Sequence, residues 1–306
     1  MRVLIVARYK DMGYAPFVVE QVDAIRKAGI DCEFFPVCRK GIRGYLKELP
    51  ALRRVVREYQ PDVIHAHYGL CGLFSNLQRS IPVVTTYHGS DINDTSVLWL
   101  SRIAMRFSAY NVFVSKKSVD LVKPQKNSAV IPCGINLDDY PLLDKAEARK
   151  QMGLDQEKKY VLFAGAFDNA VKNAPLAKVA LAQLPDVELL ELKGYSRNQV
   201  SLLMQAADAL LMTSLSEGSP QVVKEALACG CPIVSVDVGD VQERIDGIEG
   251  CWIVGRDKDE IANALSSAIA FGKRTEGRAA LIRDGLTNEI IASQLKDIYI
   301  EVSKSK

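Results

Sequence analysis

Two glutamates stand close together in the stretch 213-TSLSEGSPQVVKEALACGCP-232, with seven residues between them. Glu217 comes just before a Gly-Ser-Pro turn, and Glu225 falls inside the segment that follows the turn. A carboxylate near the start of a helix is favoured by the positive end of the helix dipole, and a carboxylate inside a helix is often simply solvated. The two residues are therefore either ordinary helix positions or a pair placed for binding, and the surrounding sequence has to decide.

The residues around the two glutamates predict a strand, a short loop and a helix. The run 209-ALLMT-213 has the apolar character of a buried strand. Ser219 is a suitable N-cap, and Pro220 fits the first helical position, where its missing N–H costs nothing. Gly230 fits a left-handed C-terminal position, and Pro232 ends the helix. Because free N–H groups and the helix dipole both attract negative charge, this unit predicts an anion-binding site.

A glycine and a lysine follow another predicted strand, in the segment 165-GAFDNAVKN-173. Gly165 allows the backbone to approach a ligand closely, and Lys172 supplies a point charge for a phosphate group. A single lysine is usually a solvated surface residue. The interpretation of Lys172 as a functional residue is strengthened by its position, because it follows the first strand of its predicted sheet, as Glu217 follows a later strand.

The histidines of the sequence lie in or next to predicted strands; they are His65, His67 and His88. The first two alternate within 63-VIHAHYG-69 and share one strand face, and the third follows the strand in 85-TTYHGSD-91. With Cys71 they are compatible with zinc, but no acidic or cysteine partner stands at a recognised metal-ligand spacing. We therefore expect imidazoles that hydrogen-bond a hydroxyl or phosphate group, and no metal centre.

Length and composition indicate a globular protein with two domains. The 306 residues are 48% hydrophobic and 25% charged, which is ordinary for a chain of two domains of about 150 residues each. No apolar run approaches the roughly 20 residues that span a bilayer, and the N-terminal run reads as a strand rather than an export signal. Seven cysteines without a CxxC pair favour reduced thiols, so we expect a cytoplasmic protein.

Short apolar runs alternate with helical segments along the chain. Because the runs are continuous, they predict strands buried on both faces of parallel sheets with crossover helices. We expect two doubly wound α/β domains, residues 1–141 and 142–287, whose loops line a central cleft, followed by an amphipathic helix over 288–304. The expected strands are 2–7, 33–37, 62–66, 82–86, 111–115, 129–132, 160–165, 187–192, 209–213, 232–236 and 251–254.

The segment 39-RKGIRGYLKELPALRRVVREY-59 combines basic residues with apolar residues at helical spacing. It holds seven basic and two acidic side chains. An ordinary surface helix packed on its sheet accounts for this pattern. The alternative is peripheral contact with an anionic membrane at its inner face, or with a lipid-diphosphate acceptor.

Taken together, these motifs resemble the family 4 retaining glycosyltransferases of the GT-B fold, which has two Rossmann-like domains. The HAH and HGSD pieces are most similar to enzymes that build bacterial surface polysaccharides, including the teichuronic acid type. The resemblance implies that the C-terminal helix, residues 288–306, crosses back onto the first domain. The stretches that carry it are 63–69, 85–91, 131-IPCGINLDDY-140, 165–173 and 213–243, in the family's order.

The resemblance implies a role for each residue around the two glutamates. In the family the second glutamate, here Glu225, binds the ribose hydroxyls of a nucleotide, and the first, here Glu217, binds hydroxyls of the donor sugar. Carboxylates accept hydrogen bonds from paired hydroxyls, and a helix N-terminus takes phosphate, so the physical chemistry agrees. The loop residues that would face the sugar and the diphosphate are Gly218, Ser219, Pro220 and Gln221.

The same resemblance gives roles to residues outside that loop. Lys172 would neutralise the diphosphate leaving group, and Gly165 would belong to the same nucleotide-binding site. His88 would reach the donor sugar from the other domain, and Gly13 would lie near the phosphate and the acceptor.

One feature departs from the family pattern. A Gly-Arg pair usually precedes the lysine, whereas here Gly165 is followed by Ala166 and Phe167. One of the two usual phosphate-binding cations is therefore missing from its place. Lys193 and Arg197 are the candidates for replacing it.

The implied reaction transfers a sugar from a UDP- or GDP-sugar to a hydroxyl of a saccharide or a lipid-linked saccharide, with retention of the anomeric configuration. No residue stands out as a covalent nucleophile, so we expect front-face displacement, without a metal or an added cofactor. No nucleic-acid partner is expected. Walker, G-x-S-x-G and G-x-G-x-x-G motifs are missing at the places where they would define other enzymes. A nucleotide-sugar epimerase of the same fold and a two-lobed binding protein remain as alternatives.

Overall fold

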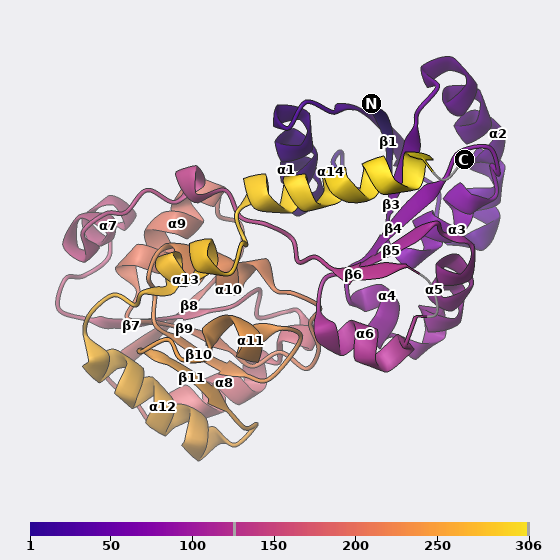
Figure 1. Cartoon of the computed structure of the whole chain (residues 1–306). Coiled ribbons are helices and arrows are strands. Elements are labelled where there is room, and N and C mark those ends of the chain that lie inside the picture. Colours follow the sequence, from indigo (N-terminus) through magenta and orange to yellow (C-terminus); the bar gives the residue numbers. More distant parts are fainter. Residues whose placement is uncertain (125–126, 305–306) are drawn as a thin grey trace. The chain divides into compact units, whose positions relative to one another are not determined.

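The computed structural model describes residues 1–124 and 127–304 and divides the chain into two compact units (Figure 1). Unit 1 consists of Met1–Gly134 and Asn288–Lys306, and unit 2 of Ile135–Thr287. The sequence pattern places the boundary slightly later, after residue 141, whereas the contacts divide the chain at Gly134. The C-terminal segment returns to unit 1, as the sequence predicts.

Unit 1 is built on a six-stranded sheet in which every strand pair is parallel. The strand order is β2-β1-β3-β4-β5-β6. The order reverses between β1 and β3, and in open α/β sheets ligands bind outside the carboxyl ends of the strands at such a reversal. The strands are β1 (Arg2–Arg8), β2 (Asp31–Val37), β3 (Val63–His67), β4 (Val83–Tyr87), β5 (Tyr110–Phe113) and β6 (Ser128–Val130).

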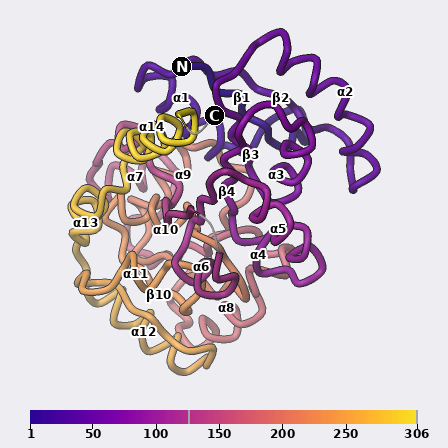
Figure 2. Tube along the Cα trace, turned by 45° about the vertical axis from the view of Figure 1, so that its right-hand side comes forward, coloured from indigo at the N-terminus to yellow at the C-terminus, as the bar shows by residue number. Residues whose placement is uncertain are grey.

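Alternate residues of β1 bury against helices on the two faces of this sheet. Val3 and Ile5 pack with helices α1 (Pro16–Lys27) and α14 (Asn288–Lys304). Figure 2 shows α14 lying along α1. On the other face, Leu4 and Val6 pack with α2 (Gly41–Tyr59) and α3 (Gly69–Asn76). The remaining helices of unit 1 are α4 (Ser90–Asn93), α5 (Thr95–Phe107) and α6 (Lys116–Val122).

Unit 2 repeats this plan with a five-stranded parallel sheet in the order β11-β10-β9-β7-β8. Here the order reverses between β7 and β9. The loops that follow those two strands carry Lys172 and Glu217. The strands are β7 (Lys159–Phe163), β8 (Val187–Glu191), β9 (Ala209–Met212), β10 (Ile233–Val236) and β11 (Cys251–Val254).

Helices cover both faces of the unit 2 sheet and bury one continuous apolar core with it. The α-helices are α7 (Lys145–Met152), α8 (Ala174–Leu181), α9 (Arg197–Ala206), α10 (Gln221–Ala228), α11 (Val241–Ile245), α12 (Lys258–Phe271) and α13 (Gly277–Arg283). Two short 3-10 helices, η1 (Leu137–Asp139) and η2 (Ala170–Lys172), lie in loops. Among the described residues, no helix is both long and apolar enough to cross a membrane.

The structure confirms the predicted fold class of two doubly wound parallel domains. Each of the predicted apolar runs contains or overlaps a strand, because a strand buried on both faces needs a continuous apolar sequence. The predicted helix at the C-terminus is also present as α14, and five of its apolar side chains are buried: Ile291, Leu295, Ile298, Tyr299 and Val302.

Candidate functional site

The loops after β7 and β9 are joined by hydrogen bonds at the point where the strand order reverses. The hydroxyl of Thr213 donates to the carbonyls of Lys172 and Asn173, at 3.0 Å each. The amide of Leu215 donates to the carbonyl of Val171 at 2.8 Å. These bonds place the lysine of one loop next to the glutamate of the other.

Lys172 and Glu217 form an ion pair, with 2.7 Å between Nζ and Oε1. Their side chains are 21% and 16% exposed, so the pair lies at a partly buried surface that a ligand can reach. Gly165, whose φ is +154°, packs against the stem of this lysine. A Cβ at Gly165 would lie 2.9 Å from Cγ of Lys172, so only glycine leaves the lysine in this position.

Glu225 lies in the second turn of α10 and is largely buried. Its Oε1 accepts a hydrogen bond from the hydroxyl of Tyr140 at 3.2 Å. Burial raises the pKa of Glu225, and the Tyr140 hydrogen bond and the positive charges of Arg197 and Lys224 offset part of this effect. A buried carboxylate next to a pocket fits a binding role better than a solvated helix position does.

One pocket of about 240 Å³ brings three of the predicted residues together: Gly165, Lys172 and Glu225. It lies within unit 2, at the carboxyl ends of β7 and β8, beside the first turn of α10. Its other lining residues are mostly apolar or small: Ala164, Leu192, Gly194, Tyr195, Val200 and Val222. An apolar pocket with a carboxylate and an ammonium at its edge suits a ring with hydroxyl and phosphate substituents.

The predicted cap of α10 is wrong. Pro220, not Ser219, is the N-cap residue, its backbone is extended, and no side chain caps the helix. The hydroxyl of Ser219 instead donates to Asp240 at 2.8 Å and accepts from Nζ of Lys224 at 2.8 Å. Two charged side chains therefore hold the Ser219 hydroxyl in place. Asp240 lies far from it in the sequence, and Lys224 lies on the next turn. Gly230 has the predicted left-handed conformation, with φ +63°.

A buried ionic cluster supports the Glu217–Gln221 loop, and the sequence analysis did not find it. Lys224 is fully buried and also donates to Oε1 of Gln221 at 2.8 Å. Asp240 is buried as well, and Arg244 lies 3.3 Å from its carboxylate. Beside Asp240, Gly239 has φ +55°, and a Cβ there would lie 2.4 Å from the carbonyl oxygen of Gly218. The two loops are thus closely packed and electrostatically linked.

Both candidates for the missing cation have acidic partners. Lys193 pairs with Asp168 at 2.5 Å on an exposed surface. Arg197 pairs with Asp139 at 2.8 Å and is close enough to Glu225 to lower the pKa of that carboxyl. Of the two, Arg197 is therefore the one that acts electrostatically on the pocket.

The three histidines of unit 1 lie side by side, and two of them, His67 and His88, form a hydrogen-bonded pair. His65 and His67 share a strand face, as predicted, with ring centroids 4.5 Å apart. His65 bonds the hydroxyl of Tyr299 on α14 at 2.6 Å through Nδ1 and Thr86 at 2.7 Å through Nε2. His67 Nδ1 lies 3.0 Å from Nε2 of His88.

Burial keeps the two strand histidines neutral. It lowers the pKa of His67 to about 3 and that of His65 well below its usual value. Nε2 of His67 is buried and has no hydrogen-bond partner among the described residues. An unfilled lone pair is less costly there than an unpaired N–H, so we place the His67 proton on Nδ1, where it is donated to His88.

Asp91 shapes the loop that carries His88. Its carboxylate accepts from the amides of His88 and Gly89 at 2.9 and 3.1 Å, and from the amide of Gly69 at 2.8 Å. Burial raises the pKa of Asp91 to about 6, although these backbone hydrogen bonds oppose the shift. The aspartate of the HGSD piece thus fixes the loop and the start of α3 together.

Gly13 lies in a tight turn after β1. Its amide and carbonyl exchange hydrogen bonds with Lys10 at 2.9 Å each. No protein atom lies within 4 Å of the position that a Cβ at Gly13 would occupy. The protein itself therefore does not require glycine here. The structure describes Gly13 and His88 in unit 1 and the other predicted site residues in unit 2.

No group of three or more metal-ligating side chains that could hold a metal ion occurs in the described part of the chain. The seven cysteines are all free thiols.

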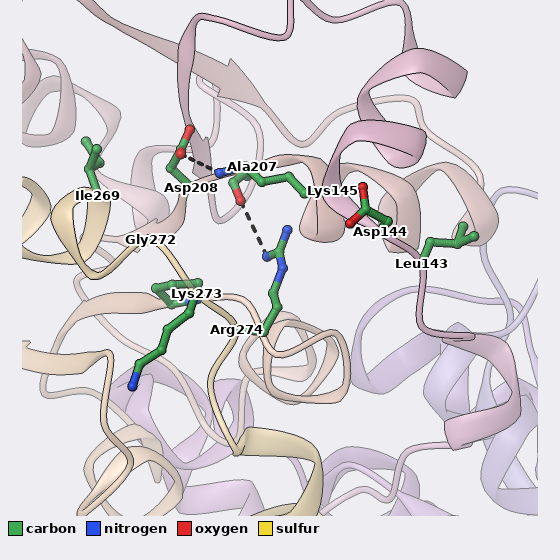
Figure 3. Close-up of a pocket in the computed structure, with 10 residues that line it drawn as sticks. Leu143, Asp144, Lys145, Ala207, Asp208, Ile269, Gly272, Lys273 and Arg274 are labelled. Atoms are coloured by element: carbon green, nitrogen blue, oxygen red, sulfur yellow. Dashed lines mark hydrogen bonds and ion pairs between the residues drawn. The ribbon is translucent and has the colours of Figure 1, made fainter.

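A second pocket in unit 2, also of about 240 Å³, is lined by several charged residues, of which Lys145 and Asp208 pair with each other (Figure 3). Asp208 accepts from Lys145 at 2.5 Å and from Arg149 at 2.9 Å. Arg274 donates to the carbonyl of Ala207 at 3.5 Å, and Lys273 points away from this network. Because both of its carboxylate oxygens are engaged, Asp208 ties α7 to the end of α9 and to β7, and we assign this pocket a structural role.

Two family models match the chain, one in each half. Glycosyltransferase Family 4 matches residues 8–139, and Glycosyl transferases group 1 matches residues 142–270. The chain belongs to these glycosyltransferases. TuaC of Bacillus subtilis (strain 168), a glycosyltransferase named for teichuronic acid biosynthesis, is 28% identical over 275 residues, which cover 75% of this chain and 68% of TuaC.

A D-inositol 3-phosphate glycosyltransferase of Mycobacterium sp. (strain KMS) is 26% identical over 272 residues. The match covers 72% of this glycosyltransferase and 62% of the mycobacterial protein, so the chain spans less than two thirds of that relative.

Solved structures share the fold over nearly the whole chain. Sucrose-phosphate synthase from Thermosynechococcus elongatus superposes with a TM-score of 0.85 at 19% identity and full coverage of both chains. Anabaena HepE in complex with UDP gives 0.77 at 18% identity, covering 98% of this chain and 100% of HepE. A UDP-GlcNAc 2-epimerase from Methanocaldococcus jannaschii gives 0.64 at 13% identity, covering 98% and 100%. At these identities the likeness establishes the GT-B fold alone.

Proposed function

We propose that this glycosyltransferase transfers a sugar from a nucleoside-diphosphate sugar to a hydroxyl acceptor with retention of configuration. The observation that carries the proposal is the pocket at the strand reversal of unit 2, where Glu225 and Lys172 stand at its edge. In this assignment Glu225 receives the ribose hydroxyls, and the apolar wall receives the base. Anabaena HepE, which has the same fold, was crystallised with UDP and with UDP-glucose, which supports a nucleotide-sugar donor for this chain.

When the donor binds, Lys172 and Glu217 would separate, and each would contact a different part of the donor. Lys172 turns to the diphosphate and neutralises the charge that develops on the leaving group. Glu217 then accepts hydrogen bonds from hydroxyls of the sugar. The ion pair places the two side chains next to each other, so each can reach its part of the donor once the pair separates.

Two residues of unit 1 are assigned to the sugar and acceptor side. His88 accepts a hydrogen bond from His67 at Nε2 and so carries its own proton on Nδ1, which lies 3.8 Å from Sγ of Cys133. The family resemblance supports the assignment of His88 to the donor sugar. Gly13 leaves open space where a side chain would stand, and we assign that space to the acceptor or the phosphate.

The transfer itself would proceed by front-face displacement. The bond between the anomeric carbon and the phosphate oxygen breaks, and the acceptor oxygen bonds to the same face of that carbon. The acceptor proton passes to the departing phosphate oxygen, so that neither a covalent enzyme intermediate nor a metal is required. Positioning of the donor and stabilisation of charge on the diphosphate supply the catalysis.

The acceptor is proposed to be a saccharide or a lipid-linked saccharide of the cell surface, and the reaction to be cytoplasmic. TuaC is named for a surface polysaccharide, which supports this assignment. The helix predicted within 39–59 is α2, and the seven basic side chains of this segment, five in α2 and two just before it, are all exposed. We therefore keep the proposal that this segment attracts the chain to an anionic inner membrane face. Liposome sedimentation of the Arg53→Glu, Arg54→Glu, Arg57→Glu variant tests it, and unchanged binding would reject it.

Product analysis tests the reaction. The chain is incubated with a UDP- or GDP-sugar, chosen from a thermal-shift panel, with and without candidate acceptors. A ligand at 100 times its Kd adds about 2.7 kcal/mol of stability, so the true donor should be visible in the panel. We expect free nucleoside diphosphate and a glycoside with the donor's anomeric configuration by NMR.

An epimerase is the second candidate, because a UDP-GlcNAc 2-epimerase shares the fold. It would use the same nucleotide contacts but would return an isomerised donor in the absence of any acceptor. That product, without a glycoside, would reject the transferase assignment in favour of this alternative.

A further inference from the structure

Helix α5 exposes large apolar side chains instead of burying them. Trp99 is 53% exposed, Ile103 36% and Phe107 61%. Their spacing of four residues places them on one face of the helix. The opposite face is the one that packs, through Leu100 and Ala104, and Figure 1 shows α5 beside α3.

Cations surround this apolar row. Arg102 and Arg106 lie on the same exposed face of α5. Segment 95–124 holds five basic residues and one acidic residue, Asp120. An exposed row of Trp, Ile and Phe interleaved with arginines is the pattern of a helix that lies in a membrane interface.

A pocket next to the row has the same two properties. It measures about 700 Å³ and lies between the end of α5 and the end of α6. The described lining residues are Arg102, Met105, Arg106, Phe107, Val122, Lys123 and Pro124. Three of these residues are cations and none is acidic, so the described lining of the pocket is partly apolar and positively charged. Leu121 of α6, 53% exposed, extends the apolar surface.

We propose that α5 and α6 form a membrane-docking surface for anionic phospholipid. Trp99, Ile103, Phe107 and Leu121 enter the interface between headgroups and acyl chains, and Arg102, Arg106 and Lys123 bind the lipid phosphates. The opposite signs of this surface and an anionic bilayer favour this occupant. A second copy of the chain is disfavoured, because two such faces would bring like charges together.

Helix α2 differs from α5 in the balance of charged and apolar residues on its exposed face. Tyr45, Leu52, Val56 and Tyr59 are buried against the sheet, and the exposed face carries five basic side chains beside two aliphatic ones, Ile42 and Leu46, which are 44% and 48% exposed. Helix α2 therefore supplies long-range attraction, which salt screens. The insertion of side chains, which salt does not screen, belongs to α5 and α6.

Trp99 provides the test, because the chain has only two tryptophans and the other, Trp252, lies in β11 of unit 2. In the full chain with Trp252→Phe, emission from Trp99 is recorded with vesicles of phosphatidylcholine alone and with added phosphatidylglycerol. We expect a blue shift only with the anionic vesicles, and quenching by lipids brominated in the acyl chains.

Two variants and one control define the surface. Ile103→Ser with Phe107→Ser should weaken binding about tenfold or more, from lost apolar burial. Arg102→Glu with Arg106→Glu should remove the preference for anionic vesicles. The control, Val179→Ser with Ile282→Ser, changes two side chains of unit 2 that are each 52% exposed, and it should bind normally.

Several results would overturn the proposal. They are an unchanged Trp99 emission with anionic vesicles, equal binding to neutral vesicles, and an equal loss in the control. A shift caused by a soluble polyanion alone, or by self-association without vesicles, would assign the surface to another partner. Binding is measured without donor or acceptor, so a negative result leaves the proposed transfer reaction untouched.

Discussion

Lys172 and Glu217 neutralise each other at the edge of the pocket, 2.7 Å apart and partly exposed. Exposed ion pairs usually contribute less than about 1 kcal/mol to stability, and in more buried pairs the cost of desolvation offsets much of the attraction, so stability alone does not explain why the two are held together. The proposed donor explains the pair better, because its diphosphate needs a positive side chain and its sugar hydroxyls need a carboxylate. The residue-scale predictions follow from this view.

The two glutamates should respond differently to loss of their charge. Glu225→Gln removes charge-assisted hydrogen bonds to the ribose, worth about 1.5–3 kcal/mol, and should weaken both the donor and the free nucleoside diphosphate roughly tenfold to hundredfold. Glu217→Gln frees Lys172 for the diphosphate and should bind it almost normally, yet turn over the full donor slowly. Calorimetry with the diphosphate and turnover assays on both variants measure this.

The assignment of the two roles is open to direct contradiction. If Glu217→Gln lost diphosphate affinity as severely as Glu225→Gln, or if both variants kept full activity, the roles would be wrong. Glu188→Gln serves as the control, because this glutamate lies on β8 in an exposed pair with Lys158.

Glu225 should also make stability depend on pH. Burial raises its pKa in the folded chain, so the folded state holds this proton more strongly than the unfolded state. Stability from this group is therefore complete below the unfolded pKa, about 4.3, and is lost as the pH rises through the raised folded value. Glu225→Gln should be more stable than the wild type at pH 7, and the difference should shrink towards pH 4. Denaturant unfolding across this range checks the sign, and a variant less stable at pH 7 would refute it.

Gly13→Ala separates a structural glycine from one kept free for a ligand. No protein atom lies within 4 Å of the added methyl group, so the melting temperature should not change. If the open space receives the acceptor or the phosphate, kcat/KM should fall several-fold with intact folding. A matched control is Gly153→Ala, where the surroundings are also open but φ is +68°, so strain alone should lower stability. Full activity in Gly13→Ala would remove Gly13 from the site.

At the scale of elements, the start of α10 depends on ionic groups behind it. Lys224 and Asp240 are both buried and meet at the hydroxyl of Ser219. Breaking a buried pair of charges typically costs about 3–5 kcal/mol, and Arg244 beside Asp240 and Glu225 beside Lys224 offset part of that cost here. Lys224→Met and Asp240→Asn should each be strongly destabilising, and the double variant should be much less so than the sum. A double-mutant cycle by chemical denaturation measures the coupling, and simple additivity would argue against it.

The sequence predicts the elements well and the cap of α10 badly, for one physical reason. Strands buried on both faces and amphipathic helices are encoded locally, so the apolar runs and the period of α14 indicate them directly. The hydroxyl of Ser219 is taken by Asp240, which follows β10, and local spacing cannot reveal that contact. The hydrogen bond from Tyr140 to Glu225 joins residues 85 positions apart and is likewise a product of tertiary packing.

At the scale of the whole molecule, the groups proposed to bind the donor divide between two compact units. The pocket residues, the Lys172–Glu217 pair and the ionic cluster all belong to Ile135–Thr287. The histidines belong to the other unit, where Tyr299 of α14 hydrogen-bonds His65 and so joins the last helix to β3. If His88 contacts the donor sugar as proposed, a nucleotide should be recognised by unit 2 alone, and recognition of the nucleotide sugar should also involve His88.

Hydrogen exchange of the full chain can test this division. The nucleoside diphosphate alone should slow exchange in the loops after β7 and β9 and at the start of α10, and should leave the loop at residues 88–91 unchanged. The complete donor should in addition slow exchange at residues 88–91, because His88 is assigned to the sugar. The His88→Ala variant is the control, since it should lose only this second effect. Protection of residues 88–91 by the diphosphate alone, or no protection there by the full donor, would show that His88 does not contact the sugar.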